Sequence, residues 1–171
     1  MTDPAARKPR TRTPEQAYAA LMRLCARAEK CEGDARRLMR RWGLGEREAA
    51  GVLARLVRER FIDDRRYAEL FVREKLRLSG WGAYKIRAAL ARKGIDRATA
   101  ERALAAVDPA QNAERLRQQL ARKMRSVKAA TPYELKTKLM RYGLSLGFDF
   151  EAVSDAVSAM IKNIDEECDI F

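Results

Sequence analysis

The sequence predicts an all-α protein made of three tandem three-helix units of helix-turn-helix type, packed into an elongated, curved molecule. Ala and Leu together number 46, against 19 for Val, Ile and Thr, which favours helices over strands. No stretch shows the apolar–polar alternation that is typical of a half-buried strand. A short pattern around a glycine recurs three times, at Gly43, Gly94 and Gly147, and indicates an internal repeat.

In chain order we expect an arm, three units and a tail. Residues 1–12 carry a net charge of +3 and no hydrophobic stretch, so we expect a disordered basic arm and not a secretory signal. Residues 162–171 carry four acidic residues against Lys162 alone and are expected to form an acidic tail. A unit of about 50 residues buries too little surface to be stable alone, so neighbouring units should pack in a row. The expected units are 13–62, 63–107 and 108–161, and their leading helices span about 14–30, 64–79 and 109–126.

Each glycine of the repeat is expected to end the second helix of its unit, because a left-handed residue commonly closes a helix. The third copy has two candidate glycines. Leu139 lies four residues before Gly143, the same spacing as Met39 to Gly43 and Leu90 to Gly94, but it lies eight residues before Gly147. Four residues are about one helical turn, so this insertion lengthens the helix and keeps its buried face. Positions six, ten and thirteen after the glycines form the apolar face of a third helix. These residues are Ala49, Leu53, Leu56, Ala100, Leu104, Val107, Val153, Val157 and Met160.

Two adjacent carboxylates, Asp63 and Asp64, lie at the start of the second leading helix. One of them is expected at the N-cap, where its oxygen accepts backbone N–H groups that have no partner within the helix. The other then lies in the first turn, near the positive end of the helix dipole. Adjacent carboxylates at a helix start cannot easily flank a bond across a cleft, as the carboxylates of a glycosidase do. We therefore interpret the pair as structural.

The composition argues against an enzyme. The chain has no His, which removes the commonest general base and metal ligand, and it has no phosphate-binding glycine loop. Cys25, Cys31 and Cys168 show no metal-ligand spacing and are interpreted as reduced thiols in a cytoplasm. No apolar run reaches the roughly 18 residues that cross a membrane. We therefore expect no catalytic residue, no cofactor, no metal and no membrane contact.

The stretch FIDDRRYAELFVREKLRLSGWGAYKIRAALARKGI (61–95) resembles the signature of the RecX family, bacterial regulators of the RecA recombinase. Two positions depart from the family pattern, since Ala83 replaces a usual Pro and Ala89 replaces a usual Glu. A second stretch, KLMRYGLSLGFDFEAV (138–153), is similar to the C-terminal repeat of the family. The residues that carry the central signature are Ile62, Asp63, Asp64, Tyr67, Ala68, Gly82, Ile86, Leu90, Lys93, Gly94 and Ile95.

The resemblance implies a function as well as a tandem three-helix fold. It implies a cytoplasmic partner of the RecA–single-stranded DNA filament that lies in the helical groove of the filament. There it would suppress ATP hydrolysis, strand exchange and filament growth in homologous recombination, DNA repair and the SOS response. We expect a monomer without a cofactor, and direct contact with single- or double-stranded DNA stays open.

Basic residues recur in the second helix of every unit, and the net charge of the whole chain is +12. Seven residues before the glycine, with Gly143 used for the third copy, lie Arg36, Arg87 and Lys136. A basic row suits either a phosphate backbone or an acidic protein groove. An ordinary solvated helix face is the alternative, and both interpretations stay open. The candidate partner-binding residues are Arg36, Arg37, Arg40, Arg41, Arg87, Arg92, Lys93, Lys136, Lys138 and Arg141.

Helix-turn-helix reading of DNA is the rival function. Asn and Gln side chains supply the usual contacts to adenine, and the expected third helices contain neither. The alternative is therefore a sequence-neutral or architectural DNA-binding protein. Of the two tryptophans, Trp42 continues the face of Leu38 and Met39 and is expected in the core. Trp81 lies between two glycines and is more open to a contact role.

Overall fold

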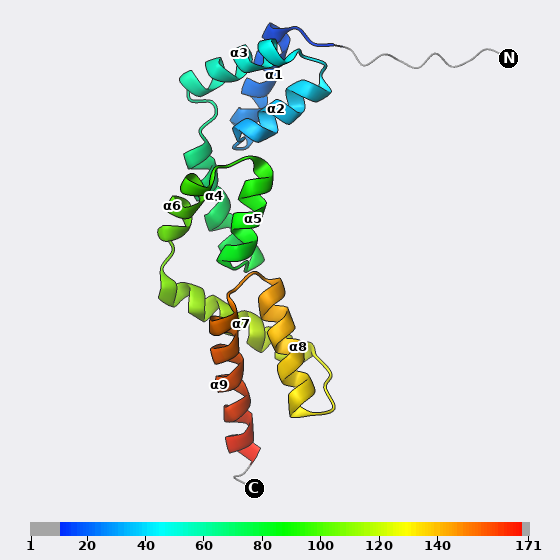
Figure 1. Ribbon diagram of the computed structural model, residues 1–171, viewed down its shortest axis with the longest axis vertical. Helices are drawn as coiled ribbons and strands as arrows, with labels where there is room; N and C mark the ends of the chain where they lie inside the picture. The colour runs from blue at the N-terminus through cyan, green and yellow to red at the C-terminus, as the bar shows by residue number, and fades with distance from the viewer. Residues whose placement is uncertain (1–10, 169–171) are drawn as a thin grey trace, which may run out of the picture. The chain divides into compact units, whose positions relative to one another are not determined.

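The computed structural model describes residues 11–168, and the secondary structure of this part of the chain is all α, as the sequence predicts (Figure 1). Nine α-helices and one π-helical turn, η1, follow one another without a strand in the described residues. Their bounds are α1 Pro14–Arg27, α2 Glu32–Arg41, α3 Glu46–Arg58, α4 Asp64–Glu74, η1 Lys75–Ser79, α5 Ala83–Lys93, α6 Arg97–Ala105, α7 Pro109–Ser126, α8 Pro132–Ser145 and α9 Phe150–Cys168.

The helix bounds agree with the expected leading helices at most of their ends. Helix α7 spans the predicted residues, whereas α1 stops at Arg27 because Ala28 is extended, with φ −162° and ψ 143°. The second leading helix reaches Ser79 only through η1, a π-helical turn, in which hydrogen bonds join residues five positions apart instead of four. Helix α9 continues to Cys168, so the backbone of the expected acidic tail is helical up to that residue.

The expected basic arm lies mostly outside the described residues, which exclude 1–10, as they exclude 169–171 of the tail. At the end of this arm, the prediction of disorder is wrong for Arg12. Its backbone N–H donates to the carbonyl oxygen of Trp42 at 3.0 Å. Its guanidinium lies 4.0 Å from the centroid of the Trp42 ring, a cation–π contact. Trp42 itself is half-buried and packs against the core of α1–α3.

The repeated glycines end helices, as predicted. Gly43, Gly94 and Gly147 have φ of 79°, 87° and 89°, values that L-residues with a side chain rarely adopt. The structure decides between the two candidates of the third copy. Gly143 lies inside α8 and faces Val153, so Gly147 is the capping residue and α8 is the longer helix. The insertion therefore adds length at the C-terminal end of α8.

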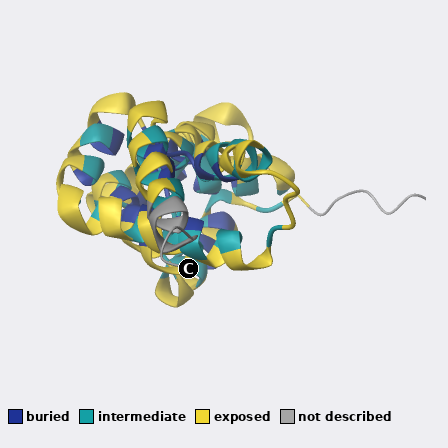
Figure 2. Cartoon of the chain, turned by 90° about the horizontal axis from the view of Figure 1, so that it is seen from below, coloured by how far each residue is buried: buried dark blue, intermediate teal, exposed yellow. Residues whose placement is uncertain are grey.

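The described residues form two compact units. The first unit extends to Ala68 and also includes the turn Lys93–Ile95. Its core is made by the inner faces of α1, α2 and α3, where apolar side chains at helical spacing meet. Figure 2, coloured by burial, shows buried and exposed residues side by side along the helices of the described chain. The buried core residues are Ala17, Leu21, Ala35, Met39, Leu44, Val52, Leu53, Leu56 and Ile62.

The second unit holds the rest of the chain, with a core between α7, α8 and α9. Two backbone hydrogen bonds join the start of α5 to the turn between α8 and α9. The N–H of Gly82 donates to the oxygen of Leu146 at 2.7 Å, and the N–H of Tyr84 donates to that of Gly147 at 2.9 Å. The buried residues of the α7–α9 core are Leu116, Leu120, Leu139, Phe148, Val153 and Val157.

The apolar face predicted for the third helices is confirmed, since none of its nine residues is exposed. Ile86 and Leu90 of the central signature are fully buried, and Tyr67 and Gly82 are buried as well. Within residues 11–168, no helix has both the length and the apolar character that crossing a bilayer requires. The same part of the chain contains no cluster of His, Cys, Asp and Glu able to hold a metal ion.

Candidate functional site

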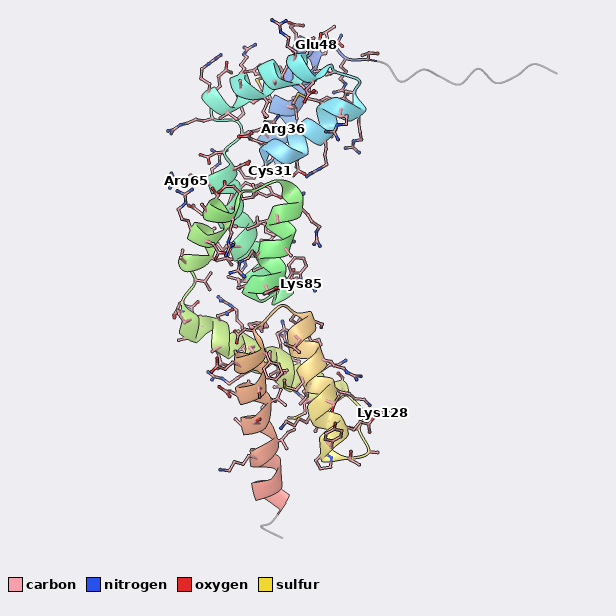
Figure 3. All side chains as sticks on the ribbon, viewed as in Figure 1. Cys31, Arg36, Glu48, Arg65, Lys85 and Lys128 are labelled. Carbon is pink, nitrogen blue, oxygen red and sulfur yellow. The ribbon has the colours of Figure 1, made fainter. Side chains whose placement is uncertain are left out.

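Helix α2 separates its apolar and basic residues onto opposite faces. Ala35 and Met39 are buried in the core of the first unit, at the helical spacing of one face. The four arginines of the same helix are exposed, because their positions fall on the other face. Figure 3 shows Arg36 on this helix, with Cys31 at its start. These arginines, all among the candidates from the sequence, are Arg36, Arg37, Arg40 and Arg41.

A hollow of about 560 Å³ lies beside α2 in the first unit. Five cationic side chains line it, and Asp34 is the one carboxylate among its lining residues. Lys93 reaches the hollow because the turn Lys93–Ile95 packs with the first unit. We call this site the basic hollow. Its lining residues are Lys30, Asp34, Arg37, Leu38, Arg40, Arg41 and Lys93.

Asp34 is already neutralised by two of the cations. The Nζ of Lys93 donates to both carboxylate oxygens, at 3.0 and 3.1 Å, and the guanidinium of Arg37 donates at 2.6 Å. Burial raises the pKa of Asp34, but the hydrogen bonds from Arg37 and Lys93 outweigh burial and hold it below its ordinary value. Burial lowers the pKa of Lys93, yet its hydrogen bond to Asp34 leaves it above its ordinary value. Both groups are therefore charged near neutral pH.

The remaining cations of the basic hollow have no carboxylate partner. Lys30, Arg40 and Arg41 make no ion pair with any residue that the structure describes. Like charges that gather without a counter-charge raise the local positive potential and attract an anionic ligand. Arginine is suited to this role, because its planar fork binds carboxylate and phosphate oxygens in pairs. The basic hollow can thus bind an anion.

The turn that carries Lys93 is held against the start of α2 by a close backbone approach. A Cβ on Gly33 would lie 1.8 Å from the carbonyl oxygen of Lys93, so only glycine fits here. The same oxygen lies 3.6 Å from the Sγ of Cys31, which donates weakly to it. Burial raises the pKa of Cys31 to about 11, so this thiol stays protonated and is not a reactive nucleophile.

Asp63 and Asp64 both serve the backbone, each for a different helix. Asp63 Oδ1 accepts the N–H groups of Arg65 and Arg66, at 2.9 and 3.1 Å, and so caps α4. Asp64 Oδ1 accepts the N–H of Glu32 at 2.8 Å, in the first turn of α2. The amide of Arg66, which stabilises the ionised form, lowers the pKa of Asp63. The pair is not arranged for acid–base chemistry.

The basic candidates of the second unit differ in their surroundings. Arg87 binds Glu101 of α6 through two hydrogen bonds, at 2.5 and 3.0 Å, so its charge is paired within the unit. Lys138 pairs with Glu134 at 2.6 Å. Lys136 and Arg141 are exposed on α8 and make no ion pair with a described residue. Arg92 is exposed near the end of α5.

The repeated basic position keeps its register in the structure. Arg36, Arg87 and Lys136 are each the fifth residue of their helix, counted from the starts of α2, α5 and α8. Since Arg36 lies in the first unit and the other two lie in the second, a continuous row over all three stays a prediction. Arg36 itself forms an exposed i,i+4 pair with Glu32 at 3.3 Å, which is worth little energy.

Sequence reasoning missed two charged residues of the basic hollow, Lys30 and Asp34. Asp34 could have been found from its i,i+3 spacing to Arg37, which is typical of a helical ion pair. Lys30 carries no such signal, because it precedes α2 and belongs to no repeated position. The pairing of Asp34 with Lys93 joins residues 59 positions apart and depends on the tertiary fold.

Two family models match the chain, each over one group of three helices. The model described as RecX, second three-helix domain, matches residues 63–104. The model described as RecX, third three-helix domain, matches residues 110–157. The first match covers α4, η1, α5 and all but the last residue of α6, and the second covers nearly all of α7, all of α8 and the first part of α9.

Individual relatives carry the same description. "Regulatory protein RecX" of Mycolicibacterium vanbaalenii is 28% identical over 168 residues, which cover 95% of this chain and 91% of that protein. The namesake from Shewanella oneidensis is 36% identical over 105 residues, which cover 54% of this chain and 82% of that protein. The chain spans about half the length, 46% and 48%, of two relatives from Clostridium botulinum strains.

A solved structure shares the fold. "Crystal structure of RecX from Lactobacillus salivarius" is similar with a TM-score of 0.75 and 20% sequence identity. The similarity covers 87% of this chain and 96% of that one. At this identity the likeness concerns the helical architecture alone.

Proposed function

Since the chain belongs to the RecX family, we propose that it is a regulator that binds the RecA–single-stranded DNA filament and restrains it. Bound in the helical groove of the filament, it slows ATP hydrolysis, strand exchange and filament growth. Catalysis by this chain is not required, because a ligand that prefers one state of a polymer shifts its partner toward that state. The role belongs to recombination and DNA repair in the cytoplasm.

The observation that carries the proposal is the basic hollow on the first unit. Its single carboxylate is already paired with Arg37 and Lys93, so the charges of Lys30, Arg40 and Arg41 are available to a partner. Exposed, unpaired arginines are common anchors of protein interfaces. A site of this kind binds an acidic surface and does no chemistry on it, as expected of a regulator.

A direct test replaces Arg40 and Arg41 by Gln, R40Q with R41Q, in the full chain. Both side chains are exposed, so folding should be unaffected, while binding to RecA filaments on single-stranded DNA should weaken about tenfold or more. The measurements are filament co-sedimentation and the concentration of the chain that halves RecA ATP hydrolysis. Circular dichroism checks that helicity is retained.

The matched control is R47Q with R58Q. Arg47 and Arg58 are exposed on α3 of the same unit and do not line the basic hollow, so the net charge falls equally. This control should inhibit almost as well as the unchanged chain, because it loses only the modest steering that two distant charges provide. Equal weakening in both double variants would assign the effect to net charge alone. Unchanged ATP hydrolysis with the natural chain would reject the regulatory role itself.

The structure also shows which basic residues are suitable for a charge-reversal test of binding. Glu at position 87 would face Glu101, the present partner of Arg87, and would repel it across the contact between α5 and α6. A loss of binding in that variant could come from misfolding. Arg36, Lys136 and Arg141 do not have this disadvantage, because each is exposed and none has a carboxylate partner outside its own helix.

A sequence-neutral DNA-binding protein is the second candidate, favoured by the unpaired cations of the basic hollow. Helices α3 and α6 contain no Asn or Gln, which agrees with neutral binding, although the extension of α9 includes Asn163. This candidate predicts binding to random duplex DNA without recombinase. If the chain inhibits RecA but does not bind random duplex DNA in excess, the result supports the regulatory proposal over the DNA-binding one.

A further inference from the structure

A second cationic surface lies in the second unit, around Trp81. The Nζ of Lys85 lies 4.8 Å from the centroid of the Trp81 ring, and that of Lys75 lies 5.5 Å away. Lys75 also lies 5.2 Å from the ring of Phe71. Two ammonium groups therefore share one indole at cation–π distance. We call Phe71, Lys75, Trp81 and Lys85, together with Tyr84, which precedes Lys85 in the sequence, the Trp81 platform.

The backbone of the Trp81 platform is fixed at both ends. The π-helical turn η1 is capped by Gly80, with φ 61°, and the N–H of Trp81 donates to the oxygen of Lys75 at 3.2 Å. The Gln119 side chain from α7 packs on Gly80, where a Cβ would lie 1.7 Å from its Nε2. Wide helical turns of this kind are frequent at functional sites, and a preordered surface binds at lower entropic cost.

The start of α5 supplies an exposed aromatic side chain beside a lysine whose charge is not neutralised. Tyr84 is 74% exposed, although its own backbone N–H is bound to Gly147. Lys85, labelled in Figure 3, donates to the carbonyl oxygen of Ser145 at 3.2 Å. A carbonyl oxygen carries no full negative charge, so the positive charge of Lys85 is not neutralised. Lys75 pairs at 2.9 Å with Glu74, but that carboxylate is more than half exposed and screened by water.

We propose that the Trp81 platform binds single-stranded nucleic acid, with a base stacked on Tyr84 and neighbouring phosphates bound by Lys85 and Lys75. Aromatic side chains interleaved with lysines suit unpaired bases, whose faces are open, and disfavour a duplex, whose base faces are covered. An acidic peptide would be bound by the lysines alone and would leave Tyr84 without a role. The inference goes beyond the proposed function, because the chain would bind a strand without the recombinase.

The test measures binding of a fluorescent oligothymidylate to the full chain without RecA. The variant Tyr84→Ala should weaken binding about tenfold, since one stacked base contributes that order of affinity. The matched control is Tyr133→Ala. Tyr133 is also the second residue of its helix and is 80% exposed, but neither tryptophan lies near it in sequence. This control should bind like the unchanged chain.

Trp81 supplies a second readout in a Trp42→Phe background, where it is the one remaining tryptophan of the sequence. Oligothymidylate should quench its emission, and an equal concentration of polyglutamate or of duplex should not compete. Tyr84→Ala binding as tightly as the unchanged chain, or equal competition by polyglutamate or duplex, would overturn the inference. Because the assay contains no recombinase, such a failure leaves the proposed regulation of RecA standing.

Discussion

Asp63 and Asp64 illustrate how one pair of neighbouring side chains can serve two helices. The first N–H groups of a helix have no partner within it, and a nearby carboxylate satisfies them while it also meets the positive end of the dipole. Asp63 does this for α4 and Asp64 for the first turn of α2. Arg66 reinforces the arrangement by binding Glu29 at 2.8 and 3.1 Å. The pair therefore couples the start of α4 to the helices before it.

The charge of Asp63 makes a testable contribution to stability. Its pKa is lowered in the folded chain, chiefly by the amide of Arg66. The charge therefore stabilises fully above the unfolded pKa of about 3.9, and this part is lost as pH falls through the folded pKa. Asp63→Asn keeps an oxygen for the cap and loses the charge. Urea unfolding followed by circular dichroism should find it less stable by up to about 1 kcal/mol near pH 7.

The difference between Asp63→Asn and the unchanged chain should shrink as the pH is lowered from 7 to below the unfolded pKa of about 3.9. Asp155→Asn is the control, because Asp155 is exposed on α9 and has no hydrogen-bond or ion-pair partner in the described residues. It should be as stable as the unchanged chain at both pH values. A deficit of Asp63→Asn that stayed the same at low pH would mean that shape, and not charge, matters at this cap.

What can be predicted at the residue scale depends on how far apart the partners are in sequence. The cap at Asp63 is local, since its partners are two and three residues away. The bond from Asp64 to Glu32 and the pair of Lys93 with Asp34 join residues 32 and 59 positions apart. Nothing in the local pattern specifies such contacts. The sequence therefore predicts that the carboxylates are structural but does not predict all of their partners.

At the scale of elements, the turn between α8 and α9 is limited by space as well as by backbone conformation. A Cβ on Gly147 would lie 2.4 Å from the Cβ of Lys85 and 2.5 Å from its backbone N. A Cβ on Gly82 would lie 2.3 Å from the oxygen of Gly147. The start of α5 and this turn can therefore approach closely only because both positions are glycine. Their hydrogen bonds depend on that approach.

Gly147→Ala should destabilise the chain by at least about 2 kcal/mol, because it adds a clash to an unfavourable positive φ. Gly51→Ala is the contrasting control. Gly51 lies inside α3 with no atom within 4 Å of its added Cβ, so alanine should stabilise by about 0.5–1 kcal/mol. Urea unfolding should give a lower free energy of unfolding for Gly147→Ala and a higher one for Gly51→Ala than for the unchanged chain. A neutral Gly147→Ala would refute the close approach of α5 to this turn.

Element positions were predictable where amphipathic spacing and caps agree. Helix α7 has Asp108 as its N-cap, Pro109 next to it and a regular apolar stripe, and its predicted bounds match. The π-helical turn η1 was not predictable, because its residues continue the same helical pattern and the wider hydrogen bonds leave no trace in it. The Trp81 platform depends on this turn, so only the openness of Trp81 to contact could be foreseen.

At the scale of the whole molecule, the repeat explains the helix order but not the location of the charge. The threefold register places the glycines and the apolar faces correctly, since both are local properties of a helix and its end. Of the arginines of the basic hollow, the register selects Arg41, two residues before Gly43. It fails to show that Arg87 is paired with Glu101, because that contact lies between two helices. A recurring charge therefore does not imply a recurring function.

The net charge of +12 should act on the rate of encounter with an anionic filament, whereas the basic hollow should act on the lifetime of the complex. Long-range steering depends on total charge and is screened by salt, so it changes the association rate. Close contacts with a partner determine mainly the dissociation rate. The double variants R40Q with R41Q and R47Q with R58Q lower the net charge equally, and so they should slow association to the same modest extent.

Only R40Q with R41Q should also dissociate faster, by about tenfold, because only these side chains line the basic hollow. Surface plasmon resonance on immobilised RecA filaments, repeated at two salt concentrations, separates the two rates. Added salt should reduce the differences in association rate between the unchanged chain and both variants. The faster dissociation of R40Q with R41Q should remain. If instead both pairs dissociate alike, the hollow has no local role, and steering by the total charge would account for all of the binding.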